Sequence, residues 1–540
     1  MFLQDPPVTP DLFEADAALQ DELARRLPAD VLDAVRPRLA AVGRATATTL
    51  AQLSRQAQAE EPEHLPFDPW GRRIDEIRVS EAWKQLKAFA STNAVVATGY
   101  DEALGEHRRV VQAALLQLYS SSSAVYSCPL AMTDAAVKVL KAAEASELRD
   151  RLLACLLSTD PASFITSGQW MTERPGGSDV GGTETIARPD GKGGWTLHGW
   201  KFFTSAVTSE MALALARIDD GVNPPVPGSR GLTLFAVEIR RDEHGQLIGI
   251  EVDRLKDKLG TRALPTAELT LTGVPATMLG EPGRGVPRIA TMLNITRFYN
   301  ATAAASGMGH AVALAKDYAG RREAFGKKLE DHPLHARALR EMEADAAGAL
   351  ALVLEVATLL GKEEAGTATS TDLALLRGLV PIAKLTTGKQ AVVVASEALE
   401  AFGGAGYMED TGIPVLLRDA QVLPIWEGTT NVLSLDLLRA QGRDGALSAA
   451  LEILNARLGA LPDLPGLDTV KALAASLPAT LRRLAKDDRL ESEARRIALT
   501  TGYLWEALLL GETAAAAGDG ATRRFSDFVE LRFLALGGWW

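Results

Sequence analysis

The sequence predicts a mainly α-helical protein with an inserted β domain, and three observations indicate this fold class. Apolar residues recur at helical spacing in long stretches before about residue 160 and again beyond about residue 288. Between 163 and 285 the chain changes to short segments rich in Thr, Val and aromatic residues, separated by Gly, Pro and Asp. With 540 residues, 47% of them apolar and 23% charged, the chain suits several packed domains and excludes whole-chain disorder.

The order of these helical and β patterns along the chain predicts four segments. Residues 1–162 form a helical domain, because stretches such as YDEALGEHRRVVQAALLQLYS carry apolar residues at helical spacing. Residues 163–287 form the β domain, and residues 288–440 contain helices long enough for a four-helix bundle. Residues 441–540 open with QGRDGALS and form an additional helical module, whose last residues, Trp539 and Trp540, are expected to pack against the body or a subunit interface.

Charge and composition exclude several functional classes. The net charge of −12 argues against a protein that coats nucleic acid with its whole surface. Cys128 and Cys155 are too few for a disulfide framework, and the start MFLQDPPVTP lacks the order of a signal peptide. There is no run of 18 apolar residues, so we expect a cytoplasmic protein without a membrane span. The seven histidines are scattered, and we expect no metal.

A small-residue loop, MTERPGGSD, spans residues 171–179 at the junction of the helical and β segments. Its glycines let the backbone approach a flat ligand closely, and Thr172 and Ser178 can donate and accept hydrogen bonds. An ordinary tight turn with an Asp cap has the same composition. The loop is therefore a candidate binding element, with the turn as the alternative.

Two further motifs follow in the C-terminal half. In EAFGGAGY, residues 400–407, Gly403 and Gly404 expose successive amides that could hold a pyrophosphate, although a helix C-cap followed by a turn looks the same. In IWEGTTN, residues 425–431, Glu427 stands beside Trp426 in apolar company that suits a general base, whereas an exposed loop glutamate is the alternative. The conjunction of the three motifs favours a common function.

These three motifs, in this order and around a β insert, resemble the acyl-CoA dehydrogenase flavoprotein family over residues of about 165 to 440. The extended N-terminus, the C-terminal extension and the wording WMTERPGGSDV and PIWEGTTNVLSLD look most like the AidB branch, which is associated with the adaptive response to DNA alkylation. The resemblance implies an acyl-CoA dehydrogenase-like fold: an N-terminal helical domain, a middle β-barrel-like domain and a C-terminal helical bundle, here followed by the extra module.

The resemblance also implies FAD as cofactor and assigns roles to residues. Thr172 would face the flavin, Phe202 would stack on it, and Arg322 would reach the FAD of a neighbouring subunit, which implies a homo-oligomer with a tetramer as the working assembly. The matching cofactor positions are Met171, Thr172, Ser178, Phe202, Phe203, Thr204, Arg322, Phe325, Gly403, Gly404, Trp426, Thr429 and Asn431. The matching acyl-CoA positions are Ser178, Arg297 and Gly428.

The implied reaction is acyl-CoA dehydrogenation. Glu427 would remove the α-proton of an acyl-CoA thioester while the β-hydride passes to flavin N5, and an electron-transfer flavoprotein would reoxidise the cofactor. Several positions depart from the family pattern: Phe202 stands where Trp is usual, Trp426 where Tyr is common, and Asn431 where Gln is usual. Nitroalkane or amine-type oxidation on the same scaffold fits less well, because the glutamate suited to a thioester is intact.

A DNA-associated protein that protects against or responds to alkylation, with FAD retained and weak dehydrogenase activity, is the alternative function. Double-stranded DNA would then be a partner of the C-terminal module, which carries 12 basic and 13 acidic residues and is therefore close to neutral. The spacing of Arg482, Lys486, Arg489 and Arg496 predicts one helical face and makes them candidates for phosphate contact. The acidic residues among them favour the other interpretation, a solvated helix with ion pairs.

Overall fold

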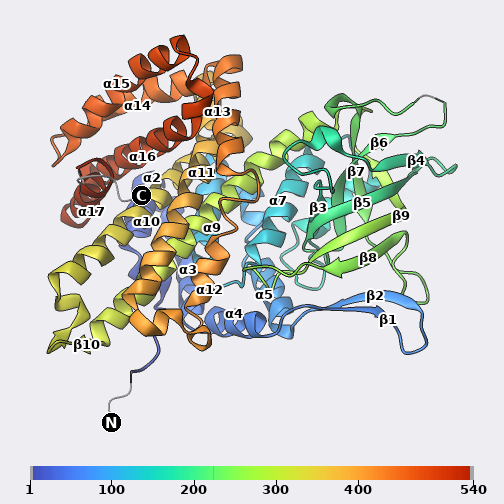
Figure 1. The fold of residues 1–540 in the computed structure, drawn as a ribbon, viewed down its shortest axis with the longest axis horizontal. Helices are drawn as coiled ribbons and strands as arrows, with labels where there is room; N and C mark the ends of the chain where they lie inside the picture. The colour runs from blue at the N-terminus through green and yellow to red at the C-terminus, as the bar shows by residue number, and fades with distance from the viewer. Residues whose placement is uncertain (1–3, 223, 535–540) are drawn as a thin grey trace. The chain divides into compact units, whose positions relative to one another are not determined.

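The structure is a computed structural model that describes residues 4–222 and 224–534. These described residues form two compact units (Figure 1). The first, called here the helical unit, contains residues 4–51, 98–122 and 300–534, and the second, called the β unit, contains the described residues of 52–97 and 123–299. The helices α4 (Thr49–Ala59) and α9 (Gly285–Arg321) run from one unit into the other.

Helices make up nearly all of the helical unit. Besides parts of α4 and α9 it contains α1 Leu12–Ala15, α2 Ala17–Arg26, α3 Ala29–Ala47, α6 Arg108–Ser120, α10 Pro333–Ala365, α11 Ser370–Ala401, α12 Pro414–Ala420, α13 Thr430–Asp444, α14 Ala446–Ala460, α15 Leu467–Lys486, α16 Leu490–Ala517 and α17 Asp519–Val529. A short hairpin of β10 (Glu323–Ala324) and β11 (Lys327–Lys328) follows α9.

Two long helices, α10 and α11, lie at the centre of this unit, and local sequence fixes their ends. Pro333 occupies the first turn of α10, where its missing N–H has no helical partner to lose, and Gly366 ends the helix in the left-handed conformation. Thr369 and Asp372 form a reciprocal capping box at the start of α11. By length and apolar character α10 could cross a membrane, but 89% of its most apolar stretch is buried inside the protein, as in a core helix.

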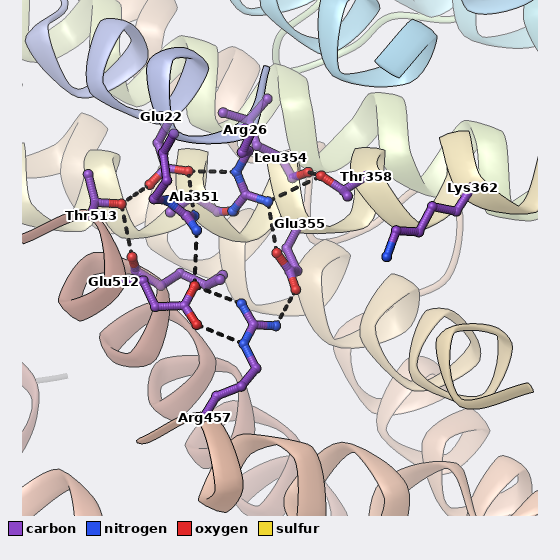
Figure 2. Close-up of polar contacts among 12 residues, drawn as sticks. Glu22, Arg26, Ala351, Leu354, Glu355, Thr358, Lys362, Arg457, Glu512 and Thr513 are labelled. Carbon is purple, nitrogen blue, oxygen red and sulfur yellow. Dashed lines mark hydrogen bonds and ion pairs between the residues drawn. The ribbon is translucent and has the colours of Figure 1, made fainter. Parts of the chain in front are cut away.

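A buried network of ion pairs joins the N-terminal helix α2 to α10, α14 and α16 (Figure 2). Arg26 on α2 pairs with Glu22 at 2.7 Å and with Glu355 on α10 at 2.8 Å. Arg457 on α14 pairs with the same Glu355 and with Glu512 on α16 at 2.7 Å. Burial alone would raise the pKa of Glu355, but Arg26 and Arg457 lower it to about 2. Each buried charge therefore has partners on at least one other helix.

The helices beyond residue 441 thus belong to the same compact unit as α10 and α11. Helix α14 is in contact with α11, and α16 is in contact with both α10 and α11. The proposed domain boundaries at 162, 287 and 440 stay predictions. The tryptophan pair, Trp539 and Trp540, lies outside the described residues.

The β unit holds the predicted β segment together with helices from the N-terminal part of the chain. Its helices are α5 Glu81–Thr92, α7 Ser127–Lys141 and α8 Glu147–Leu156. Its strands are β1 Glu63–Phe67, β2 Arg73–Arg78, β3 Ser167–Trp170, β4 Ile186–Pro189, β5 Trp195–Ser205, β6 Met211–Ile218, β7 Leu232–Glu238, β8 Ile250–Leu255 and β9 Thr266–Met278. The predicted order of a helical segment, a β segment and a second helical segment is confirmed.

The strands of the β segment close into a barrel. Strand β6 pairs in parallel with β4, and β4–β5, β5–β9, β9–β7 and β7–β6 pair antiparallel, which completes the ring, while β3 adds to β6 and β8 to β9. Alternate residues point inward along each strand, so Leu197, Phe235, Val252 and Leu269 meet in one buried cluster with Trp170. The apolar residues that alternate along each strand therefore form the core of the barrel.

One part of the N-terminal segment differs from the helical prediction. Residues 63–78 form the antiparallel hairpin β1–β2. Pro66 and Pro69 disfavour a helix here, and the Asp68 carboxylate accepts hydrogen bonds from the backbone N–H of Trp70 at 2.8 Å and of Arg72 at 2.9 Å, which fixes the turn. Short-range turn chemistry therefore overrides the helical pattern of the neighbouring sequence.

Candidate active site

The loop at residues 171–179 lies in the β unit directly after β3 and beside β5. The backbone N–H of Phe202 donates to the carbonyl of Thr172 at 2.9 Å, which ties the loop to the strand. Gly177 comes so close to Thr172 that a Cβ there would lie 2.4 Å from the threonine Oγ1. Glycine is thus required by space at this position, and Met171 is buried whereas Ser178 is exposed at the end of the loop.

A buried ion pair between Glu173 and Lys201 anchors the same loop to the barrel. The Glu173 carboxylate accepts hydrogen bonds from the N–H of Glu184, from the Thr185 hydroxyl and from Lys201 Nζ, each at 2.6 Å. Lys201 also donates to the Leu215 carbonyl at 3.1 Å. Burial lowers the pKa of Lys201, and the Glu173 carboxylate opposes that shift. The residue after Thr172 is therefore fixed to β5 and β6.

The aromatic pair of β5 lies at a bulge. Pairing with β9 shifts register between Lys201 and Thr204, and the two rings of Phe202 and Phe203 stand edge to face with centroids 5.0 Å apart. Lys256 Nζ lies 3.3 Å from the Phe202 ring centroid, a cation–π contact. Phe203 is 51% exposed, whereas Thr204 is buried and its hydroxyl donates to the Ala267 carbonyl at 2.6 Å. The bulge thus leaves the Phe203 ring half exposed, with Lys256 over both rings.

The remaining candidate of this unit is Arg297, which lies half-buried on α9. The structure therefore brings Met171, Thr172, Phe202, Phe203 and Thr204 together around one loop and one bulge of the β unit.

Glu427 lies in the helical unit, in the connection between α12 and α13. Its backbone has a φ of +58°, which L-residues other than Asn and Asp seldom adopt, and Gly428 follows with a φ of +104°. Thr429 caps α13, its hydroxyl oxygen accepting from the Val432 N–H at 3.4 Å. Such positive φ values persist only where neighbouring contacts impose them, and they cluster at functional sites.

Helix α11 supplies those contacts. Lys384, a fully buried lysine, donates from Nζ to the Gly428 carbonyl at 2.6 Å. At Gly388, one turn further along α11, a Cβ would lie 3.1 Å from the Leu423 carbonyl oxygen, so the helix packs directly against the chain before Trp426. With the Asn300 amide oriented to satisfy its neighbours, its oxygen accepts from the Trp426 indole N–H. The turn carrying Glu427 is thus braced on both sides.

Two more candidate groups occupy the surface of the helical unit. At Gly403, φ is +61°, and apart from the adjoining residues no atom of residues 4–222 and 224–534 lies within 4 Å of a Cβ added at Gly403 or Gly404, so this backbone is open to a ligand. Phe325, at the turn of the β10–β11 hairpin, is 98% exposed, and Arg322 beside it is half-buried. An aromatic ring that is fully exposed on a hairpin suits a contact with another molecule.

The basic residues of the C-terminal module do not share one helix, which corrects the prediction of a single face. Helix α15 ends at Lys486 and α16 begins at Leu490, and Asp488 between them has a φ of +53°. Arg482 and Lys486 therefore lie on α15, and Arg496 lies on α16. Arg489 and Arg496 both pair with Glu493, at 2.7 Å and 3.4 Å. The predicted ion pairs are present, and two adjacent aspartates break the helix because they favour helix ends.

Three side chains that position these loops were not selected from the sequence: Glu173, Lys201 and Lys384. Lys201 and Lys384 are lone charges in largely apolar runs, such as LVPIAKLTTG around Lys384, whereas Glu173 is directly followed by Arg174. A lone charge is costly to bury unless it forms hydrogen bonds or ion pairs, and this is the signal that could have identified the two lysines. Among residues 4–222 and 224–534, no group of His, Cys, Asp or Glu is arranged to hold a metal ion.

Comparison with known proteins gives consistent matches along the chain. Residues 4–160 match the N-terminal domain of the adaptive response protein AidB, residues 168–274 the middle domain of acyl-CoA dehydrogenases, and residues 283–442 their C-terminal domain. Acyl-CoA dehydrogenase family member 11 of Caenorhabditis elegans is 42% identical over 98% of this chain and 88% of that protein.

Two further similarities agree with these matches. The putative acyl-CoA dehydrogenase AidB of Escherichia coli strain K12 is 32% identical over 76% of this chain and 74% of that protein. The crystal structure of Caenorhabditis elegans ACDH-11 in complex with C11-CoA has a TM-score of 0.93 and 40% identity, covering 98% of this chain and 92% of that chain.

Proposed function

The chain belongs to the acyl-CoA dehydrogenase family, whose members are FAD-dependent oxidoreductases, and from this premise we propose that Glu427 is its catalytic base. The braced turn around Glu427 carries the proposal. A thioester α-proton is weakly acidic, so a carboxylate has to be held in a defined position at contact distance from it. The contacts from Lys384 and Gly388 supply that constraint.

In the proposed reaction, the Glu427 carboxylate takes the α-proton of an acyl-CoA thioester, the α C–H bond breaks, and the product is a 2,3-enoyl thioester. Bound FAD supplies the two-electron acceptor that takes the hydride from the β-carbon. The chain's part is to bind the thioester, to hold the base and to exclude water. The backbone N–H of Glu427 is a donor for the thioester oxygen as negative charge develops there.

We assign two separate sets of residues to FAD, the first to the flavin and the second to the pyrophosphate of the FAD of a neighbouring subunit. In the β unit, Thr172 and the bulge aromatics Phe202 and Phe203 offer hydrogen bonds and a flat apolar face. In the helical unit, the open backbone at Gly403 and Gly404 suits a pyrophosphate, because a side chain there would otherwise block its approach. These features fit the cofactor.

The exposed Phe325 and its neighbour Arg322 support a homo-oligomer in which this hairpin contacts the FAD of another subunit, with a tetramer as the expected assembly. An electron-transfer flavoprotein is the proposed electron acceptor. The resemblance to a protein crystallised with C11-CoA supports an acyl-CoA thioester of medium length as substrate, with Arg297 and Gly428 among its contacts.

Anaerobic titration of the purified protein with straight-chain acyl-CoA thioesters of increasing length tests the proposal. We expect yellow protein whose flavin absorbance bleaches most with chains near eleven carbons. If the protein holds FAD but none of the thioesters bleaches its absorbance, the dehydrogenase function is contradicted.

A DNA-associated role in the alkylation response is the second candidate, and the match to the AidB N-terminal domain together with the similarity to AidB favours it. The near-neutral charge after residue 441 and the pairing of Arg489 and Arg496 with Glu493 weaken it. Full-length Arg482→Glu/Lys486→Glu protein, compared with wild type in a salt-dependent titration of double-stranded DNA, tests it. Equal binding of both proteins at every salt concentration would exclude these residues as phosphate contacts.

A further inference from the structure

A carboxyl group is buried where three long helices of the helical unit meet. Glu506 lies on α16 and is 0% exposed. Helix α10 passes so close to it that a Cβ added to Gly348 would lie 3.3 Å from Glu506 Oε2. On α11, the buried amide of Gln390 donates from Nε2 to the same Oε2 at 2.8 Å. Glu506 is thus enclosed by α10, α11 and its own helix, away from the residues assigned to FAD and the thioester.

The buried cation of this junction is engaged by a different carboxylate. Arg532 lies in the short helical segment Glu530–Leu534 that follows α17. It donates from Nε to Asp345 Oδ1 at 2.9 Å and from Nη2 to Asp345 Oδ2, and both side chains are buried. Two parallel hydrogen bonds make this a strong, oriented ion pair. Among the described residues, the hydrogen-bond partner of Glu506 is therefore the uncharged Gln390.

Two oxygen atoms at this junction, Glu506 Oε1 and Gln390 Oε1, accept no hydrogen bond from the described residues, and both are shielded from solvent. The amide cannot be turned over to satisfy them, because its Nε2 also donates to Asp345 Oδ1 at 3.4 Å, and the exchange would place its oxygen against that carboxylate. An ionised Glu506 can only accept hydrogen bonds, so it would leave both oxygens unsatisfied and bury a charge as well. A protonated carboxyl supplies the one missing donor.

The electrostatic surroundings of Glu506 also favour its protonated form. Burial, followed by the Asp345 carboxylate, raises the pKa of Glu506 well above its ordinary value of 4.5, and Arg532 and Gln390 oppose the shift only in part. Burial raises the pKa of Asp345 too, but the two hydrogen bonds from Arg532 favour its ionised form. Of the two buried carboxyls, Glu506 is therefore the one that holds a proton.

The other groups around the junction leave this assignment unchanged. Tyr503, on the same helix as Glu506, stays neutral because burial raises its pKa to about 12. Helix α17 contributes an apolar ring, since a Cβ added to Gly348 would lie 3.0 Å from Phe528. On α10, Glu341 pairs with Arg337 at 2.8 Å.

We propose that Glu506 is a carboxylic acid in the folded protein at neutral pH, and that its Oε1–H donates to the carbonyl of Gln390. The two side chains then exchange two hydrogen bonds, from Gln390 Nε2–H to Glu506 Oε2 and from Glu506 Oε1–H to Gln390 Oε1. Loss of the proton removes the second bond and places two buried carboxylates beside the one guanidinium of Arg532. The pair is thus a pH-sensitive contact between α11 and α16, and it does not depend on the function assigned to Glu427.

Infrared spectroscopy of the purified full-length holoprotein at pH 7 tests for the proton directly. We expect the C=O stretching band of a protonated carboxyl, absent from Glu506→Gln protein and retained in Glu491→Gln, an exposed position on the same helix. Labelling the glutamate carboxyls with ¹³C should shift this band, and labelling the aspartate carboxyls should not. A shift on aspartate labelling would assign the proton to Asp345, and absence of the band would mean that Glu506 is ionised. Either result overturns the proposal.

The pH dependence of stability gives the second measurement. Folded Glu506 keeps a proton that the unfolded chain releases above pH 4.5, so wild type should lose stability relative to Glu506→Gln as pH rises. Between pH 5.5 and pH 7, the ratio of their unfolding constants, wild type over variant, should rise about tenfold per pH unit, as one proton per molecule requires. The same ratio for Glu491→Gln should stay constant. A constant or falling ratio for Glu506→Gln would refute a protonated Glu506.

A third variant keeps the test decisive if Glu506→Gln does not fold. Gln390→Met removes the proposed acceptor, so the infrared band that shifts on glutamate labelling should move to higher frequency, as expected for a carboxyl that has lost a hydrogen bond. Gln441→Met, at a half-buried position on α13, should leave the band where it is. An unmoved band in folded Gln390→Met protein would show that the proton is not shared with Gln390.

Discussion

Lys384 Nζ donates a hydrogen bond of 2.6 Å to the backbone carbonyl of Gly428, the residue that directly follows Glu427. This contact connects the centre of α11 with a turn whose φ values of +58° and +104° need outside support. The lysine is fully buried, so hydrogen bonds such as this one have to offset the free-energy cost of removing its charge from water. Lys384 is therefore a positioning residue for the proposed base.

Replacing this lysine should impair the chemical step while the cofactor stays bound. We expect Lys384→Met to reduce flavin at saturating acyl-CoA ten- to a hundredfold more slowly, because a base displaced by about 1 Å loses a rate factor of that order. KM and FAD content should change little. Stopped-flow measurement of flavin bleaching checks this.

Two further variants separate positioning from stability. Lys384→Arg retains a donor and should recover part of the rate, and Lys389→Met, a half-exposed lysine on the same helix, should behave like wild type. A Lys384→Met protein with a lower melting temperature but the wild-type bleaching rate would show that the contact is structural only.

Removing the base itself gives a sharper result. Glu427→Gln keeps the size of the side chain but cannot accept the α-proton, so we expect bleaching by acyl-CoA to slow at least a hundredfold. FAD content should equal that of wild type. Glu409→Gln, at a largely exposed glutamate on the neighbouring turn, serves as the control and should bleach normally. Normal bleaching in Glu427→Gln protein would mean that another group is the base.

Much of the fold follows from patterns in the sequence, and the departures have local causes. The switch from helical to alternating periodicity located the barrel, because each pattern describes the buried face of one element. The β1–β2 hairpin escaped this reasoning because two prolines and the Asp68 turn act over only a few residues. The break between α15 and α16 escaped it because two adjacent aspartates, Asp487 and Asp488, suit an exposed helix surface as well as a helix end.

The candidate site was predictable to a different degree. Gly177 belongs to a motif that stands out in the sequence, but the reason for this glycine, a Cβ that would lie 2.4 Å from Thr172 Oγ1, is visible only in the fold. Lys201 and Lys384 act through backbone carbonyls and a carboxylate distant in sequence, at Glu173 and Gly428. Periodicity carries no information about such pairs, because only the folded chain brings them together.

The Glu173–Lys201 pair leads to a prediction for cofactor binding. Glu173→Gln removes the charge that faces the buried Lys201 ammonium, and breaking a buried pair from one side costs about 3–5 kcal/mol. Since the same carboxylate ties the loop of Thr172 to its surroundings, we expect at least tenfold weaker FAD binding in a titration of apoprotein with FAD. Glu243→Gln, with its side chain 86% exposed, should bind FAD like wild type. Equal affinity of both variants for FAD would show that the ion pair does not contribute to cofactor binding.

The ion-pair network of Figure 2 predicts that Arg457 stabilises the attachment of α14 to α10 and α16. Arg457→Met leaves the buried Glu355 and the half-buried Glu512 with fewer partners, so the free energy of unfolding should fall by about 3–5 kcal/mol. Arg443→Met breaks an exposed pair with Asp444 and should cost less than about 1 kcal/mol. Denaturant titrations of the two variants give the comparison. Equal losses of unfolding free energy would show that burial of the network does not increase its contribution to stability.

The same network predicts how stability depends on pH. The pKa of Glu355 is lowered from its ordinary value of 4.5 to about 2, so its contribution is fully present above pH 4.5 and is lost as pH falls toward 2. A difference of that size corresponds to roughly 3 kcal/mol at about 1.4 kcal/mol per pH unit. In Glu355→Gln protein we expect lower stability at pH 7 and a shallower decline of melting temperature between pH 5 and pH 3. Glu243→Gln should follow the wild-type curve, because its side chain is exposed. Parallel curves for Glu355→Gln and wild type would mean that Arg26 and Arg457 do not hold this carboxylate ionised in the folded protein.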